Sequence, residues 1–114
     1  MSNEGRKDDG QKLRYDLIPP IVDEALATVL MDGAAKYGDN NWMNGIKYRR
    51  IYAALQRHLA AWRRGEIMDQ DSGRPHLWHA LTELSFLTYY EDNLDLYSSF
   101  NDFIHEWMGE EVGS

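Results

Sequence analysis

Residues 47–91 decide the fold class and read KYRRIYAALQRHLAAWRRGEIMDQDSGRPHLWHALTELSFLTYYE. Apolar side chains recur there three and four positions apart, which is the spacing of one face of a helix. They are Ile51, Leu55, Leu59 and Trp62 in the first half and Leu77, Leu81, Leu84 and Leu87 in the second. Gly65 is a typical helix end and Pro75 a typical helix start. The stretch therefore predicts two helices, at about 47–64 and 75–91, whose apolar faces point inward.

The residues before this stretch predict a third long helix at about 20–37. Pro19-Pro20 opens it, because proline suits the first turn of a helix, and apolar positions then recur at threes and fours. The turn-forming sequence Gly38-Asp39-Asn40-Asn41 ends it and begins a loop at 38–46. Residues 1–18 mix glycines with charges and predict an N-terminal arm.

The C-terminal side predicts a fourth helix near 99–109, because Ser99-x-x-Asp102 resembles a capping box. No run alternates at period two, so we expect no strand. The prediction is an all-α antiparallel bundle of about four helices within a single domain, 1–114. We divide it into the arm, a catalytic helical core at 19–92, and an acidic C-terminal helix at 93–114.

Composition limits the kinds of site. The chain has 114 residues and no cysteine, which excludes disulfides, thiolate nucleophiles and zinc sites that need sulfur. Its net charge of −7 is matched by seven acids after residue 90, where no Lys or Arg occurs: Glu91, Asp92, Asp95, Asp102, Glu106, Glu110 and Glu111. Residues 40–65 are basic, and 66–71 are acidic. This suits a small polyanion with a divalent cation better than duplex nucleic acid; the alternative is ordinary solvated faces. No membrane segment is indicated, and we expect a cytoplasmic location.

A cluster of imidazoles and carboxylates is the first candidate site. His76, His79 and Glu83 share one face of the predicted helix 75–91. A loop that folds back would bring acids to the start of that helix, and these acids are Glu66, Asp69 and Asp71. Imidazole and carboxylate groups together can ligate a divalent ion. The alternative is a capped helix with ordinary hydrogen-bonded histidines.

Two residues of the helix at 47–64 extend this candidate site. His58 continues the apolar stripe and faces the bundle, where it is either a satisfied core histidine or a partner of the other imidazoles. Arg57 would lie at the edge, where its guanidinium can grip a phosphate or form a surface salt bridge.

Trp42 stands in the loop 38–46, where no helical stripe requires a tryptophan. Its indole could stack on a nucleobase, with Asn41 beside it as an edge-reading amide. Equally, it could plug the end of the bundle.

Several short motifs in order resemble a known family. They are Lys7-x-Asp9-x-x-Lys12, Leu17-Ile18-Pro19-Pro20, Gly33-Ala34-x-Lys36-Tyr37, Asn41-Trp42, Arg57-His58, Gly65-Glu66-x-x-Asp69-x-Asp71-Ser72-Gly73 and His76-x-x-His79-Ala80. In order and spacing they resemble the phage dATP/dGTP diphosphohydrolase family, related to the MazG-like all-α pyrophosphohydrolases. The resemblance implies hydrolysis of a purine deoxynucleoside triphosphate to the monophosphate and pyrophosphate with Mg²⁺ or Mn²⁺, in phage nucleotide-pool metabolism.

The resemblance also implies roles for residues at the matching positions. Expected metal ligands are Glu66, Asp69, Asp71, His76 and His79. Expected substrate-binding residues are Lys7, Lys12, Lys36, Asn41, Trp42 and Arg57. Expected catalytic residues are Glu66, Asp69 and His58. Glu24 is a further catalytic candidate from its place on the helix at about 20–37, as an additional metal ligand or the general base, and not from the resemblance. MazG-like relatives form dimers or tetramers, so we expect a homo-oligomer. The alternative function is a non-catalytic phage protein that sequesters a nucleotide.

Overall fold

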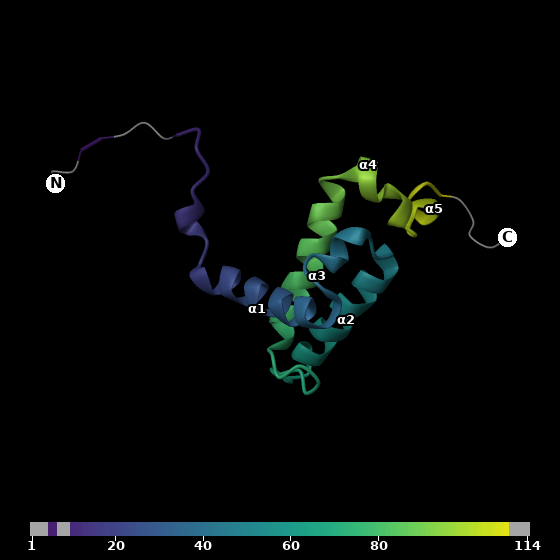
Figure 1. The fold of residues 1–114 in the computed structure, drawn as a ribbon, viewed down its shortest axis with the longest axis horizontal. Helices are drawn as coiled ribbons and strands as arrows, with labels where there is room; N and C mark the ends of the chain where they lie inside the picture. The colour runs from purple at the N-terminus through teal and green to yellow at the C-terminus, as the bar shows by residue number, and fades with distance from the viewer. Residues whose placement is uncertain (1–4, 7–9, 110–114) are drawn as a thin grey trace.

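The computed structural model describes residues 5–6 and 10–109, and its framework is three long helices (Figure 1). These are α1 at Pro20–Tyr37, α2 at Tyr48–Arg63 and α3 at His76–Glu91. All three predicted helices are confirmed to within one residue at each end. Within the described residues the structure has no strand, as predicted, and only an isolated bridge joins Met68 to Pro75. The all-α class is therefore confirmed.

Glycines with positive φ end α1 and α2. Gly38 has φ +90° and donates its N–H to the Ala34 carbonyl at 2.8 Å, and Gly65 has φ +93° and donates to Trp62 at 2.9 Å. A side chain disfavours this backbone region, whereas glycine enters it freely. Both glycines thus turn the chain sharply at the positions that the sequence indicated.

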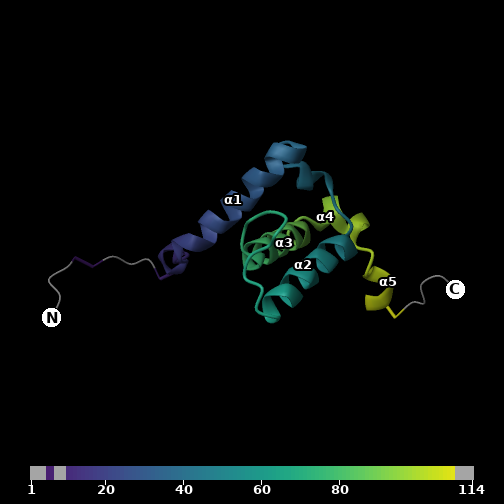
Figure 2. The same ribbon diagram turned by 90° about the horizontal axis from the view of Figure 1, so that it is seen from below.

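The helices α2 and α3 form an antiparallel hairpin, and α1 crosses α3 (Figure 1 and Figure 2). The main core lies where α2 begins and α3 ends, around the buried residues Tyr48, Ile51, Tyr90 and Tyr97. Stacked tyrosine rings fill this core, with Tyr90 lying 5.9 Å from Tyr48 and 4.4 Å from Tyr97 between ring centroids. Aromatic packing therefore holds one end of the hairpin and leaves the opposite end to polar residues.

The predicted inward face of α3 was wrong for two of its four leucines. Leu77 and Leu84 are 43% and 49% exposed, whereas His76 and Tyr90 are 5% and 0% exposed. The reason is that the histidine face of α3 finds polar partners on α2 and on the loop before α3, as described below. Leu81 is half-buried, and Leu87 packs against the core as predicted.

The predicted helix at 99–109 was also wrong. The structure has two single-turn helices instead, α4 at Leu94–Tyr97 and α5 at Ile104–Trp107, and short 3₁₀ turns at Tyr15–Leu17 (η1), Asn41–Asn44 (η2) and Ser98–Phe100 (η3). Asn101 breaks the helix, because its backbone is extended and its buried amide oxygen accepts the Phe103 N–H at 3.0 Å.

The acidic segment instead packs on the start of α2. The Asp102 carboxylate accepts the Arg49 N–H at 2.9 Å, and the Arg49 guanidinium donates to Glu106 at 2.6 Å. Because the N-terminus of a helix has unpaired N–H groups and a positive dipole end, these carboxylates stabilise the first turn of α2. The predicted capping box at Ser99 does not form, since Ser99 lies within η3.

Two further features concern the surface. Every residue from 10 to 21 is exposed, including both ends of η1. Within the described residues, no helix has the length and apolar character needed to cross a bilayer.

Candidate metal and nucleotide site

The loop between α2 and α3 folds back on itself and carries acidic residues to the start of α3. His76 donates its N–H to the Ile67 carbonyl at 2.9 Å, and Asp69 donates to the Arg74 carbonyl at 2.9 Å. Gly73, with φ +71°, closes the turn by donating its N–H to the Asp69 carbonyl at 2.8 Å. The predicted folding back of this loop is therefore confirmed.

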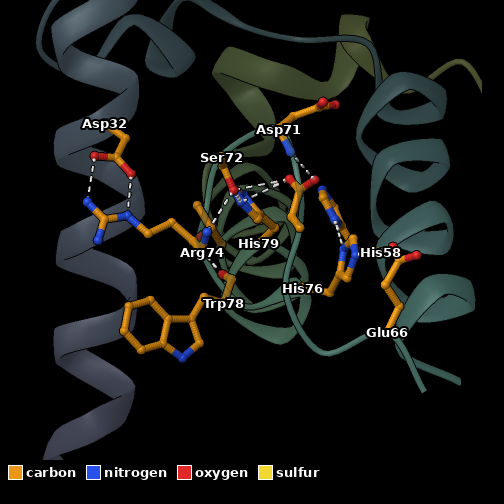
Figure 3. Close-up of polar contacts among 11 residues, drawn as sticks. Asp32, His58, Glu66, Asp71, Ser72, Arg74, His76, Trp78 and His79 are labelled. Carbon is orange, nitrogen blue, oxygen red and sulfur yellow. Dashed lines mark hydrogen bonds and ion pairs between the residues drawn. The ribbon is translucent and has the colours of Figure 1, made fainter.

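His76 joins α2 to this loop through both of its ring nitrogens (Figure 3). Its Nδ1 lies 2.9 Å from Nδ1 of His58, and its Nε2 lies 2.8 Å from the Glu66 carboxylate. A carboxylate only accepts hydrogen bonds, so in a neutral His76 the proton is on Nε2 and Nδ1 is the acceptor. Nδ1 of His58 is then the donor, and Nε2 of His58 keeps its lone pair.

His79 adds a third imidazole from α3. Its ring stacks on His58 with centroids 4.6 Å apart, and its Nε2 lies 2.6 Å from the Ser72 hydroxyl and 3.5 Å from the Asp69 carboxylate. Asp69 also accepts hydrogen bonds from the Ser72 hydroxyl at 3.1 Å and from the Asp71 N–H at 3.2 Å. Three imidazoles and Asp69 thus form one continuous polar cluster.

The electrostatics of this cluster favour the protonation states that bind metals. Burial lowers the pKa values of His58 and His79, because it penalises the charged imidazolium. Burial pushes the pKa of Asp69 upward, but the hydrogen bonds from Asp71 and Ser72 and the nearby imidazoles outweigh it, so this pKa is lowered. At neutral pH the two imidazoles are neutral and the carboxylate is ionised, as ligation requires.

The residues present fit a divalent ion. Three possible ligand atoms, one each from His58, Asp69 and His76, all lie within 4.8 Å of one another. Imidazole nitrogen suits Fe²⁺, Ni²⁺, Cu²⁺ and Zn²⁺ best, and both Mn²⁺ and Mg²⁺ favour oxygen ligands. Of these last two, the transition-metal ion Mn²⁺ accepts imidazole more readily. Glu66 and His79 lie at the edge of this set, where each contacts a member of the cluster. The side chain of Asp71 points away from the imidazoles (Figure 3).

A pocket of about 1010 Å³ lies between α1, the loop 38–46, α2 and α3. Arg57, which precedes His58 on α2, and Glu83, one turn after His79 on α3, both line it. The same two helices therefore lead from the imidazole cluster into the pocket. Of the predicted substrate-binding residues, Arg57, Asn41 and Trp42 line this pocket.

Trp42 plugs the end of the bundle and also lines the pocket. Its ring stacks on Phe86 at 4.8 Å and meets Tyr89 edge-on at 5.0 Å, and its carbonyl accepts the Tyr90 hydroxyl at 2.5 Å. These contacts favour the structural interpretation of Trp42. Contact between its indole and a base stays a prediction.

Comparison with known proteins identifies the family of this chain. Residues 2–99 match the sequence model of a family described as dATP/dGTP diphosphohydrolase, N-terminal. The chain belongs to this family. A relative named dATP/dGTP diphosphohydrolase, from Salmonella phage PMBT28, is 35% identical over 89 residues, which are 78% of this chain and 30% of the relative. The chain thus spans about a third of that relative's length. No solved structure matches the chain.

The match to the diphosphohydrolase N-terminal family covers the whole candidate site. Residues 2–99 contain the imidazole cluster, the loop before α3 and the pocket, whereas α5 lies beyond it. The resemblance seen in the sequence is therefore confirmed as family membership.

The remaining predicted residues lie farther from the cluster. Lys36 is exposed on α1, but its charge acts on Asp32 and His79. Asp32 forms an ion pair with Arg74 at 2.9 Å, which ties α1 to the loop before α3 (Figure 3). Glu24 and Lys12 are exposed, and the described part of the chain offers their side chains no hydrogen bond or ion pair. Lys7 lies outside the described residues.

One pocket residue was missed in the sequence, and another was named there with the imidazoles but given no role. Arg50 lines the pocket from α2, and Glu83 lines it from α3. Arg50 lies seven positions before Arg57, two helical turns on the same face, which is a signal that could have found it. Glu83 shares the helical spacing of His76 and His79, but nothing in the spacing distinguishes a pocket acid from a solvated one.

Proposed function

We propose that this chain hydrolyses a purine deoxynucleoside triphosphate between the α and β phosphates, releasing the monophosphate and pyrophosphate, in phage nucleotide-pool metabolism. The observation that carries the proposal is the imidazole–carboxylate cluster beside a pocket lined by two arginines, Arg50 and Arg57. Such a site can bind metal-coordinated phosphates at one end and a nucleoside at the other. Family membership and the name of the phage relative support the same activity.

His58, Asp69 and His76 would hold the divalent ion. When bound, such an ion neutralises phosphate oxygens and lowers the pKa of a water molecule to the point where it can attack phosphorus. The imidazole nitrogens lead us to propose Mn²⁺, or another ion that accepts nitrogen ligands, in preference to Mg²⁺.

The arginines supply the charge that the leaving group needs. Pyrophosphate departs with accumulating negative charge, and a guanidinium binds phosphate oxygens with two parallel hydrogen bonds. Arg57 stands beside the cluster, and Arg50 lies two helical turns farther along the pocket. Lys36 contributes a further positive charge near His79.

His79 is suited to take a proton from the attacking water. Its pKa is lowered by burial, so it is a neutral base at pH 7. Because the Ser72 hydroxyl donates to Asp69, Nε2 of His79 donates to Ser72, and Nδ1 is the nitrogen that can accept a proton. Glu66 positions His76 because its carboxylate accepts the hydrogen bond that Nε2–H of His76 donates. A catalytic role for Glu24 remains a prediction from its place on α1, and phosphate contacts from Lys7 and Lys12 remain predictions from the resemblance.

The first experiment incubates the purified chain with each deoxynucleoside triphosphate and either Mn²⁺ or Mg²⁺, followed by chromatography of the products. We expect pyrophosphate from dATP and dGTP, faster with Mn²⁺. Asp69→Asn should reduce turnover by about 100-fold or more, because an amide is a weak metal ligand. Asp71→Asn is the matched control, since its carboxylate points away from the cluster.

Two other results would contradict the proposal in whole or in part. Orthophosphate as the first product would contradict cleavage between the α and β phosphates. Saturable nucleotide binding with no turnover under either metal would favour the sequestering protein.

A further inference from the structure

Glu83 is a pocket residue that the proposed chemistry does not use. Its side chain is partly buried and lines the pocket together with Asn41, Trp42 and Phe86. Among the described residues its carboxyl forms no hydrogen bond and no ion pair within 4 Å, although the charge of Arg57 acts on it. A carboxyl that faces a pocket without a hydrogen-bonding partner is available to a ligand.

The position of Glu83 along α3 separates it from the phosphate end of the site. Seven residues separate it from His76, which is about 10 Å along a helix that rises 1.5 Å per residue. This separation is comparable with the reach from the α-phosphate of a nucleotide to its base. An acid also repels a triphosphate, so with the phosphates at the imidazole cluster and Arg57, Glu83 faces the nucleoside.

The chemistry of a carboxyl group matches both purines, one in each protonation state. An ionised carboxylate accepts two hydrogen bonds, and the Watson–Crick edge of guanine offers two adjacent donors, N1–H and the N2 amino group. A neutral carboxylic acid has one acceptor and one donor. The Watson–Crick edge of adenine offers the complementary pair, the N6 amino donor and the N1 acceptor.

We propose that Glu83 selects the purine base: its carboxylate reads guanine and its protonated form reads adenine. This inference rests on the proposed function, because it assumes that a purine nucleotide occupies the pocket. It accounts for one site that accepts two bases with opposite hydrogen-bonding edges.

The electrostatic surroundings place both forms of Glu83 within reach near neutral pH. Burial raises the pKa of Glu83 to about 7, and the opposing charge of Arg57 only partly reverses this. The other titratable or charged groups around Glu83 come from each element of the pocket: Tyr37 from α1, Asp39 from the loop, Arg50 from α2, and His79 and Tyr90 from α3. Among the described residues, Tyr37 is the only ionisable side chain that α1 adds to the lining.

The test measures the dissociation constants of dGMP and dAMP by calorimetry between about pH 6 and about pH 8. The ratio of the two constants is the readout, because titration of the phosphate is common to both ligands and cancels. The apparent dissociation constant equals the intrinsic constant divided by the fraction of protein in the binding-competent protonation state. The ratio of dGMP to dAMP constants should therefore fall by up to about 100-fold as the pH rises through this range.

The variant Glu83→Gln imitates the protonated acid, since its amide has one acceptor and one donor. It should bind dAMP with an affinity that no longer depends on Glu83 ionisation, about tenfold tighter than the wild type at about pH 8. Its affinity for dGMP should fall at least about tenfold at the same pH. The matched control is Glu91→Gln, an exposed acid of α3 outside this pocket, which should leave the ratio unchanged.

Two results would overturn the inference. One is a ratio of dissociation constants that stays the same at every pH. The other is a Glu83→Gln variant that binds both nucleotides more weakly by the same factor. If the wild type hydrolyses dATP and dGTP but either of these results is obtained, base selection by Glu83 is wrong and the proposed function stands. If the wild type neither binds these nucleotides nor hydrolyses dATP or dGTP, both are wrong. If it hydrolyses them but binds neither monophosphate, base selection by Glu83 is wrong and the proposed function stands.

Discussion

At the scale of single residues, the raised pKa of Glu83 predicts how the free energy of unfolding depends on pH. This pKa is about 7 in the folded chain, against an ordinary value of 4.5. Between these values the folded state binds more protons than the unfolded state, so the free energy of unfolding falls as the pH rises from about 4.5 to about 7 and then levels off. Glu83→Gln removes this penalty and should stabilise the fold at pH 7 and above, by at most about 3 kcal/mol.

Urea denaturation of the wild type and Glu83→Gln across this pH range checks the prediction. The difference between the two proteins should be small in acid and largest above pH 7. Glu91→Gln is exposed on the same helix and should show no such trend. A constant difference between Glu83→Gln and the wild type at all pH values would contradict the raised pKa.

Individual contacts of the site were predictable only where helical spacing fixes them. The meeting of His58 with His76 followed from an antiparallel hairpin whose loop spans about ten residues, and the structure places their Nδ1 atoms 2.9 Å apart. The exposure of Leu77 and Leu84 was not predictable in this way. Leucine is usually buried, but in α3 the hydrogen bonds of His76 and the tyrosines rotate the helix so that these leucines face outward.

At the scale of elements, Gly45 controls how the loop 38–46 packs on the C-terminal segment. Its φ is +106°, and a Cβ at this position would overlap the ring of Phe100 in η3. Gly45→Ala combines backbone strain with overpacking and should cost about 4 kcal/mol of unfolding free energy. The change would separate the loop from η3 and loosen the aromatic core around Tyr97.

The matched control is Gly38→Ala. Gly38 has a similarly positive φ of +90°, but its Cβ would meet nothing within 4 Å. It therefore suffers only the backbone strain, about 1–2 kcal/mol. Thermal unfolding of both variants should show the larger loss for Gly45→Ala, and equal losses would argue against the close contact with Phe100.

The sequence predicts the elements well where strong local signals bound them. Proline before α1 and α3 and glycine after α1 and α2 mark these helices to within one residue. The segment after α3 has no such signals. Its apolar residues Phe100, Phe103 and Trp107 have the spacing of a helical stripe, but Asn101 interrupts the helix after Phe100. Phe100 and Phe103 pack against the core, and Phe103 also contacts Arg49 and stacks on Trp107.

At the scale of the whole molecule, several large apolar side chains of α1 and α3 are exposed. α1 has 18 residues, of which only Ala25 is fully buried. Ile21 and Met31 on α1 are 51% and 71% exposed, and Leu84 on α3 is 49% exposed. Exposed apolar surface of this kind is typical of an interface. We therefore keep the proposal that the chain forms a homo-oligomer.

Light scattering after size exclusion checks this proposal directly. The chain mass is 13.3 kDa, so we expect a particle of at least twice this mass at micromolar concentration. Ile21→Glu and Leu84→Glu place a charge on the exposed apolar surface and should shift the particle toward the monomer, because burying an unpaired charge costs several kcal/mol. Gln56→Glu adds the same charge at an exposed polar position of α2 and should leave the mass unchanged. A wild-type particle of 13.3 kDa at every concentration tested would show that this surface serves another purpose.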